Sequence, residues 1–223
     1  MADMTRLTED QIARRVAMEL QDGWLVNVGI GMPTSVLPYV PPDRDVIFHS
    51  ENGIVGIGPI VTDPALADPD LLSPGKFPVV LMPGGCFVHH ADSFAIIRGG
   101  HLDAAILGAF QVAENGDMAN WKLPGERAGS VGGAMDIASS TPRVFIMMTH
   151  TTKDGTPKIV RRLTYPLTAQ RAVTKIFTDM AVIAVSRDGL VLQEIAPGVT
   201  VEQVQAATEA RLVILDPVKT VES

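Results

Sequence analysis

Apolar and polar positions follow two different periods along the chain, and the period indicates which segments form helices. Apolar residues at positions 12, 16 and 20 recur every four residues, directly after a tetrapeptide at 8–11 in which Thr8 and Gln11 can form a capping box. Gly23 is a suitable terminator, so we expect a helix from Thr8 to about Asp22. A second capping-box tetrapeptide at 200–203 predicts a late helix that ends near position 210.

Short apolar runs that end in small residues predict buried strands. Such runs occupy 24–28, 46–49 and 79–82, and each leads directly into a turn of small residues. Further strands are expected at 104–107, 144–148, 181–185 and 212–215, and helices at 93–98 and 168–177. The alternation predicts an α/β fold with an open, largely parallel sheet and flanking helices.

Two stretches of the chain have no regular pattern of apolar residues. They lie at 62–76 and 114–129, and we expect both to be loops of the kind that often border binding sites in α/β proteins. No linker of serine, proline or charged residues divides the sequence. Residues 1–223 are therefore expected to form one domain.

The composition indicates a globular protein with an acidic balance of charge. Apolar residues make up 46% of the chain, and 18 Lys and Arg stand against 25 Asp and Glu, a net charge of −7. Nucleic acid is therefore not an expected partner. Any anionic ligand needs basic residues close by, supplied either by a partner or by Lys153, Lys158, Arg161 and Arg162.

Cysteine usage and hydropathy indicate where the protein resides. Cys86 is the single cysteine, which excludes an internal disulfide and favours a reducing compartment. No stretch approaches the ~18 consecutive apolar residues of a membrane span, and residues 1–6 lack the pattern of a signal peptide. We expect a cytoplasmic protein without a membrane partner.

Two phosphate-binding motifs are excluded by their spacing. Residues 29–34 begin like a dinucleotide fingerprint, but Thr34 occupies the place of the third glycine. The pair Gly75-Lys76 is not preceded by a glycine at P-loop spacing and is followed by Phe77. Neither segment predicts a nucleotide site.

Hydrolase and metal chemistry are also poorly supported. Ser130 lies in a pattern similar to a nucleophile elbow, with His150 as a conceivable base, but residues 123–127 cannot form the strand that such an elbow requires. The neighbouring histidines His89 and His90 lack the spacing of metal ligands. No metal site is expected.

The tetrapeptide Ser-Glu-Asn-Gly at 50–53 is the most informative segment. It places Glu51 at the carboxyl end of a predicted strand, where α/β proteins bind ligands. A glutamate is ionised at neutral pH without a general base, and carboxylates can form covalent acyl intermediates. Gly132 and Gly133 offer unobstructed backbone amides for an oxyanion. Composition alone favours the plainer interpretation of Glu51 as a solvated glutamate in a loop.

Five blocks of sequence together resemble the B subunit of the family I 3-oxoacid CoA-transferases. They cover nearly the whole chain in the order 27–34, 50–53, 97–103, 116–121 and 132–136. Within that family, residues 84–94 are most similar to the 3-oxoadipate branch. Departures from the family pattern lie at Ser73-Pro74 and at Cys86, and they concern loop shape and pocket lining.

The resemblance implies a CoA-transferase fold and a ping-pong reaction. CoA would move from succinyl-CoA to a 3-oxo acid, either 3-oxoadipate or, alternatively, acetoacetate, through a thioester on Glu51. CoA and succinyl-CoA would be substrates, and no cofactor would be needed. A separate A subunit would complete a heterodimer or heterotetramer.

The resemblance also implies roles for individual residues. Glu51 would be the nucleophile, and the amides of Gly132 and Gly133 would face the thioester oxygen. The side chains of His89 and His90 are expected either to donate hydrogen bonds to the distal carboxylate of 3-oxoadipate or to lie on a solvated turn, in which case the pocket would accept short 3-oxo acids alike. The complete set of expected binding residues is Asn27, Gly31, Asn52, Lys76, His89 and His90.

Two other classes of protein remain as alternatives at this point. A sugar-phosphate isomerase of related architecture would use carboxylates as proton-transfer bases, but it has no evident need for Ser-Glu-Asn-Gly. A non-catalytic effector-binding domain would normally be joined to a helix-turn-helix, and we expect the residues before Trp24 to be too few for one.

Overall fold

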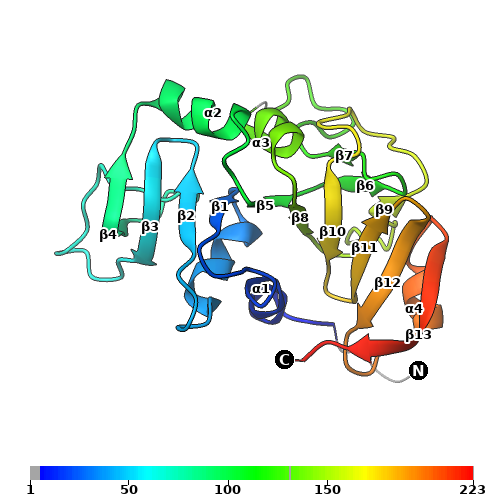
Figure 1. The fold of residues 1–223 in the computed structure, drawn as a ribbon. Helices are drawn as coiled ribbons and strands as arrows, with labels where there is room; N and C mark the ends of the chain where they lie inside the picture. The colour runs from blue at the N-terminus through cyan, green and yellow to red at the C-terminus, as the bar shows by residue number, and fades with distance from the viewer. Residues whose placement is uncertain (1–5, 131, 223) are drawn as a thin grey trace.

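A ten-stranded mixed sheet forms the centre of the protein in a computed structural model that describes residues 6–130 and 132–222 (Figure 1). The strand order is β13-β12-β11-β10-β8-β5-β1-β2-β3-β4. The bounds are β1 Leu25–Val28, β2 Ile47–Ser50, β3 Ile54–Ile60, β4 Val79–Phe87, β5 Ala104–Gly108, β8 Val144–Met147, β10 Val173–Phe177, β11 Ala181–Ser186, β12 Gly189–Ile195 and β13 Leu212–Thr220. A smaller sheet has the order β7-β6-β9, with bounds β6 Gln111–Ala113, β7 Met118–Ala119 and β9 Ile159–Val160.

The five strands at the centre of the large sheet are parallel. β1 pairs with β2 and β5, and β8 pairs with β5 and β10, all in the same direction. The strands on either side, β3 with β4 and β11 with β12, pair antiparallel, and β13 returns parallel to β12. The predicted α/β fold with a largely parallel sheet is confirmed, with antiparallel pairing confined to the outer parts.

Both predicted capping boxes are present. The α1 helix, Glu9–Ala17, begins at Thr8, and α4, Val201–Ala206, begins at Thr200. Each helix is shorter than predicted. After α1 the chain tightens, because the amides of Glu19 and Leu20 bond to carbonyls only three residues earlier. Leu20 is nevertheless fully buried, so the apolar period continues beyond the end of the helix.

The remaining helices lie near the ends of the central strands. The α2 helix, His90–Arg98, starts earlier than predicted because the His89 side chain accepts a hydrogen bond from the Ala91 amide at 3.1 Å. It lies beside α3, Ala134–Ser140, and Arg98 Nε is 2.7 Å from Asp136 Oδ1 (Figure 1). A 3-10 helix, η1, Met32–Tyr39, follows β1. The sequence pattern predicts neither α3 nor η1.

Three predictions about strands are wrong or incomplete. The helix expected at 168–177 is instead a loop followed by β10, whose backbone pairs with β8 and β11. The turn expected at 83–85 lies inside β4, which extends to Phe87 against β3. The strands β3, β6, β7, β9 and β12 are absent from the prediction. The expected loops hold, since 62–76 contains no helix or strand and 114–129 contains only β7.

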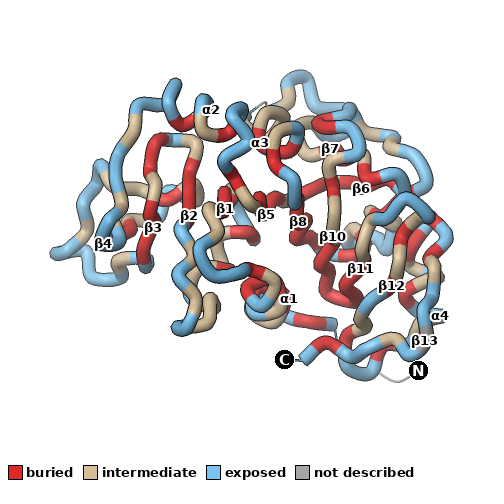
Figure 2. Tube along the Cα trace, viewed as in Figure 1, coloured by how far each residue is buried: buried red, intermediate tan, exposed pale blue. Residues whose placement is uncertain are grey.

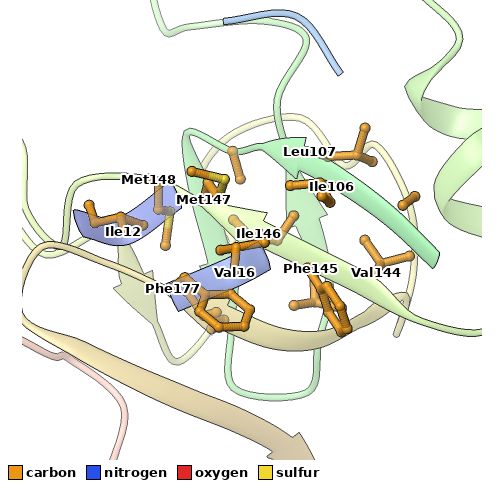
Figure 3. Packing of buried hydrophobic residues seen from close by; sticks show 14 of the residues in the cluster. Ile12, Val16, Ile106, Leu107, Val144, Phe145, Ile146, Met147, Met148 and Phe177 are labelled. Carbon is orange, nitrogen blue, oxygen red and sulfur yellow. The ribbon is translucent and has the colours of Figure 1, made fainter. Parts of the chain in front are cut away.

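The core lies between the central strands and α1. Buried residues follow β1, β5, β8 and β10, whereas β4 is mostly exposed (Figure 2). Ile12 and Val16 of α1 pack over Ile146 and Phe177, and the Phe145 and Phe177 rings meet edge to face with centroids 5.7 Å apart (Figure 3). Each fully buried aliphatic side chain contributes about 1.5–3 kcal/mol. The ends of the central strands are therefore fixed by a well-packed scaffold.

Within the described residues, no helix combines the length and apolar character that a membrane crossing requires.

Candidate active site

A cavity of about 500 Å³ lies at the carboxyl ends of the parallel strands. Because β1, β2, β5 and β8 run in the same direction, the residues that follow them reach the same edge of the sheet. The cavity lining combines residues that follow these strands with residues from the segments before α3 and β9. The lining includes Gly29, Ile30, Glu51, Gly108, Phe110, Met148, Gly132, Gly133 and Lys158.

Glu51 sits in a tight turn between β2 and β3. The Gly53 amide donates to the Ser50 carbonyl at 3.0 Å, and the Gly53 carbonyl accepts from the Val88 amide at 2.9 Å. His90 Nδ1 donates to the Glu51 carbonyl oxygen at 3.0 Å. Gly53 has φ +109°, and a Cβ there would collide with the Val88 carbonyl oxygen. The turn therefore requires glycine, and it aims Glu51 at the cavity.

Three buried side-chain polar atoms in the described residues have no hydrogen-bond partner, and all three lie at this end of β1 and β2. They are Asn27 Oδ1, Ser50 Oγ and Glu51 Oε2. Leaving one such atom unpaired costs about 1–3 kcal/mol, and native proteins rarely retain several together without a functional reason. Of the three, only Glu51 lines the cavity, so its unpaired oxygen is the one available to a ligand there.

The two predicted glycines lie beside Glu51. A Cβ at Gly133 would come within 3.4 Å of Glu51 Cγ and 3.0 Å of Phe94 Cζ, whereas one at Gly132 would meet nothing within 4 Å. Both glycines line the cavity. The structure therefore brings together Glu51, Gly132 and Gly133, from segments that are about 80 positions apart in sequence.

Asn27 lies behind the cavity in a buried network. Its Nδ2 is 3.0 Å from His49 Nδ1, and His49 Nε2 is 2.9 Å from Ser93 Oγ. Burial lowers the pKa of His49 to about 4, so the ring is neutral at pH 7. An amide nitrogen can only donate, so His49 Nδ1 accepts from Asn27, and His49 Nε2–H donates to the Ser93 hydroxyl oxygen. Asn27 contacts His49 and does not line the cavity.

The other predicted binding residues lie at the margin. The Asn52 Nδ2 donates to the Leu72 carbonyl at 3.1 Å, and Lys76, at φ +62°, lies in the loop that follows. Gly31, at φ +86°, precedes η1 between two residues that do line the cavity. None of these three residues is itself part of the lining.

The predicted histidine pair is also outside the cavity lining. The His89 side chain caps α2, and His90 holds the Glu51 backbone while its ring packs against Phe94 with centroids 4.9 Å apart. The structure thus places His90 behind the nucleophile candidate. His150 is fully buried, with each ring nitrogen 2.8 Å from a threonine hydroxyl, so it has no free nitrogen to serve Ser130 as a base.

Lys158 is a cavity residue for which the sequence indicates only a general basic character. It precedes β9, and its Nζ is 3.4 Å from Thr149 Oγ1. Burial lowers the pKa of its ammonium group. No apolar period indicates β9, which has only two residues, so no local signal could place Lys158 in the cavity lining.

Residues 9–207 match the protein family described as Coenzyme A transferase. The chain belongs to the coenzyme A transferase family. This membership identifies it as part of a CoA-transferase enzyme and decides against the isomerase and effector-binding interpretations.

Related proteins agree with this family. The chain is 50% identical over 211 residues to the B subunit of 3-oxoadipate CoA-transferase from Acinetobacter baylyi, covering 93% of this chain and 96% of that protein. It is 47% identical over 203 residues to the beta subunit of acetate CoA-transferase from Escherichia coli K12, covering 91% and 92%. The crystal structure of an acyl-CoA transferase from Escherichia coli O157:H7 has the same fold, with a TM-score of 0.76 at 21% identity. That match covers 100% of this chain and 44% of the other.

Proposed function

We propose that this chain is the B subunit of a CoA-transferase that moves CoA from succinyl-CoA to a 3-oxo acid, with 3-oxoadipate as the acceptor. The observation that carries the proposal is the unpartnered carboxylate oxygen of Glu51 in a cavity at the carboxyl ends of the strands. The names of the relatives support the subunit and the acceptor class. A separate A subunit is the expected partner.

Four steps complete the exchange. The Glu51 carboxylate attacks the thioester carbonyl of succinyl-CoA, which forms a mixed anhydride and releases the CoA thiolate. The thiolate attacks the glutamyl carbonyl, which forms a glutamyl-CoA thioester and releases succinate. The carboxylate of the 3-oxo acid then attacks that thioester, and the thiolate released attacks the new acyl carbonyl. The products are 3-oxoacyl-CoA and free Glu51, and CoA acts as a substrate throughout.

The residues around Glu51 suit these steps. The side chain lacks a partner on one oxygen, so it can reach a carbonyl carbon without first breaking a hydrogen bond to the protein. Gly133 carries no side chain beside Glu51, and the amides of Gly132 and Gly133 are the proposed donors to the tetrahedral oxyanion. The neutral Asn27–His49–Ser93 network would hold the end of β1 against that of β2 during both half-reactions.

Removing the nucleophile tests this proposal directly. Glu51→Gln should abolish exchange in the assembled enzyme, because an amide cannot form the anhydride. Glu51→Asp should lose ~100-fold or more, because the carboxylate retreats by about 1 Å in a site fixed by packing. Incubation with succinyl-CoA and peptide mapping by mass spectrometry should find CoA on Glu51. An adduct on Cys86 or Ser130 would refute the assignment.

The acceptor is tested by comparing two 3-oxo acids. The chain resembles 3-oxoadipate and acetate transferases almost equally, at 50% and 47% identity, so overall identity does not select the acceptor. We expect a higher kcat/KM for 3-oxoadipate than for acetoacetate at fixed succinyl-CoA. Equal kcat/KM values for the two acids would refute 3-oxoadipate as the preferred acceptor and support only the broader class of 3-oxo acids.

A further inference from the structure

The cavity lining holds two charged side chains of opposite sign, Glu51 and Lys158, which we call its two poles. Among the described residues that line it, Glu51 and Lys158 are the two with charged side chains. They belong to different segments, the turn after β2 and the approach to β9, and no ion pair within 4 Å joins them. Much of the remaining lining is apolar, including Ile30, Leu107 and Met148. A ligand that fits between the poles therefore needs an electrophilic end, an apolar middle and an anionic end.

Lys158 lacks an anion of its own. In the described part of the chain no carboxylate lies within 4 Å of its Nζ, and its one hydrogen bond is a long contact of 3.4 Å to Thr149 Oγ1. Burial lowers the pKa of Lys158, and the negative charge of Asp179 opposes that shift without a direct contact. The Asp179 carboxylate already accepts hydrogen bonds from Arg6 at 2.8 Å and from the His150 amide at 2.7 Å. A half-buried ammonium group without an ion-pair partner is costly unless a ligand supplies the missing charge.

We propose that Lys158 binds the second, non-reacting carboxylate of a dicarboxylic acyl substrate and thereby makes the enzyme selective for diacids. This inference rests on the proposed function, and it narrows the substrate to acyl groups with a free carboxylate at the far end. Both the succinyl donor and a 3-oxoadipyl acceptor belong to that class. Acetoacetate, which has one carboxylate, would leave Lys158 without a partner.

This placement differs from the one that the sequence predicts for the distal carboxylate. His89 caps a helix and His90 holds the backbone of Glu51, and neither lines the cavity. Lys158 does line it, on a segment separate from Glu51. The distance between Glu51 and Lys158 would then set the length of the acyl chain that the site accepts.

The test is a ratio of specificities in the assembled enzyme. The kcat/KM for 3-oxoadipate divided by that for acetoacetate is measured for the parent, Lys158→Met, Lys158→Gln and Lys158→Arg. A charged hydrogen bond changes binding by about 10- to 100-fold, so the ratio should fall by that factor in the methionine and glutamine variants and be partly retained in the arginine variant. Lys219→Met, at an exposed position on β13, serves as the matched control and should keep the parent ratio.

The half-reaction gives a second readout that separates this proposal from the assignment of Glu51. Formation of the enzyme-bound CoA thioester is followed by mass spectrometry with succinyl-CoA and with acetoacetyl-CoA. In Lys158→Met, the rate with succinyl-CoA should fall while the rate with acetoacetyl-CoA changes little. Glu51 variants should form no thioester with either donor, whereas Lys158 variants should still form it with acetoacetyl-CoA. That pattern would support Glu51 as the nucleophile independently of Lys158.

Several results would overturn the role of Lys158. One is a parent enzyme with equal kcat/KM for both acids, and another is an equal loss for both acids in Lys158→Met and Lys158→Gln. A third is a ratio of kcat/KM for 3-oxoadipate to that for acetoacetate that falls in His89→Ala or His90→Ala but not in the Lys158 variants. That result would show that the histidines bind the distal carboxylate.

Discussion

A single glycine fixes the conformation of the turn that carries Glu51. Gly53 combines a positive φ with a close approach to the Val88 carbonyl, and the same two residues share a backbone hydrogen bond. The strand that follows, β3, starts at Ile54. A change at position 53 would therefore disturb both the turn and the pairing of β3 with β4.

Gly53→Ala should be strongly destabilising, by about 3 kcal/mol or more, because the methyl group meets backbone that cannot easily yield. Gly23→Ala is the control, since Gly23 has φ +76° and open space around it, and it should cost only about 1–2 kcal/mol. Urea unfolding of the two variants measures the difference. Equal losses would show that the collision with Val88 is relieved by a small shift.

At the scale of elements, two buried histidines tie segments together. His49 joins β2 to β1 and to α2, and His150 joins the end of β8 to Thr178 and Thr208. Burial lowers the pKa of each to about 4 from the ordinary value of 6.5. Between these two values the unfolded chain binds protons that the folded chain excludes, so these histidines make stability highest above pH 6.5 and lower as the pH falls toward 4.

We therefore expect each of these histidines to remove about 2 kcal/mol of unfolding free energy between pH 7 and pH 5. His150→Gln should abolish roughly half of that combined loss, because an amide can still reach a threonine but does not titrate. Urea unfolding at the two pH values, in parent and variant, provides the measurement. An unchanged pH dependence in the variant would show that His150 takes up its proton over the same pH range in the folded and unfolded protein.

The elements that the sequence predicts correctly are those with local signals. The capping boxes at Thr8 and Thr200 depend on contacts three residues apart, and the apolar runs of β1, β5 and β8 are buried on both faces. The apolar residues of β10, Val173, Ile176 and Phe177, have helical spacing, and it is pairing with β8 and β11 that makes the segment a strand. A strand end marks the place of Glu51, but only the resemblance of Ser-Glu-Asn-Gly to the CoA-transferases predicts its role as nucleophile. Lys158 precedes a two-residue strand that no apolar period indicates.

At the scale of the whole molecule, the distribution of charge bears on assembly. The chain has a net charge of −7, and the cavity lining contains one cation, Lys158, among the described residues. CoA itself carries several phosphate charges, which a surface of this kind does little to attract. A second subunit is therefore the expected source of additional positive charge.

The purified chain alone should accordingly show no measurable exchange between succinyl-CoA and a 3-oxo acid. Addition of the A subunit should restore turnover, and the rate should saturate at the stoichiometry of the complex. Activity titrations with the separately purified subunits, checked by size-exclusion chromatography, measure both effects. Full turnover by the isolated chain would contradict the need for a partner.

The position of β1 in the middle of the sheet has a consequence for synthesis of the protein. Val28 pairs with Ile106, which lies 78 positions later in the chain. At ribosomal speeds of about 5–20 residues per second, the β5 neighbour of β1 is made about 4–16 s after β1 itself. During that interval the apolar strand has one bare edge, so a nascent chain is vulnerable to aggregation well before its active site can form.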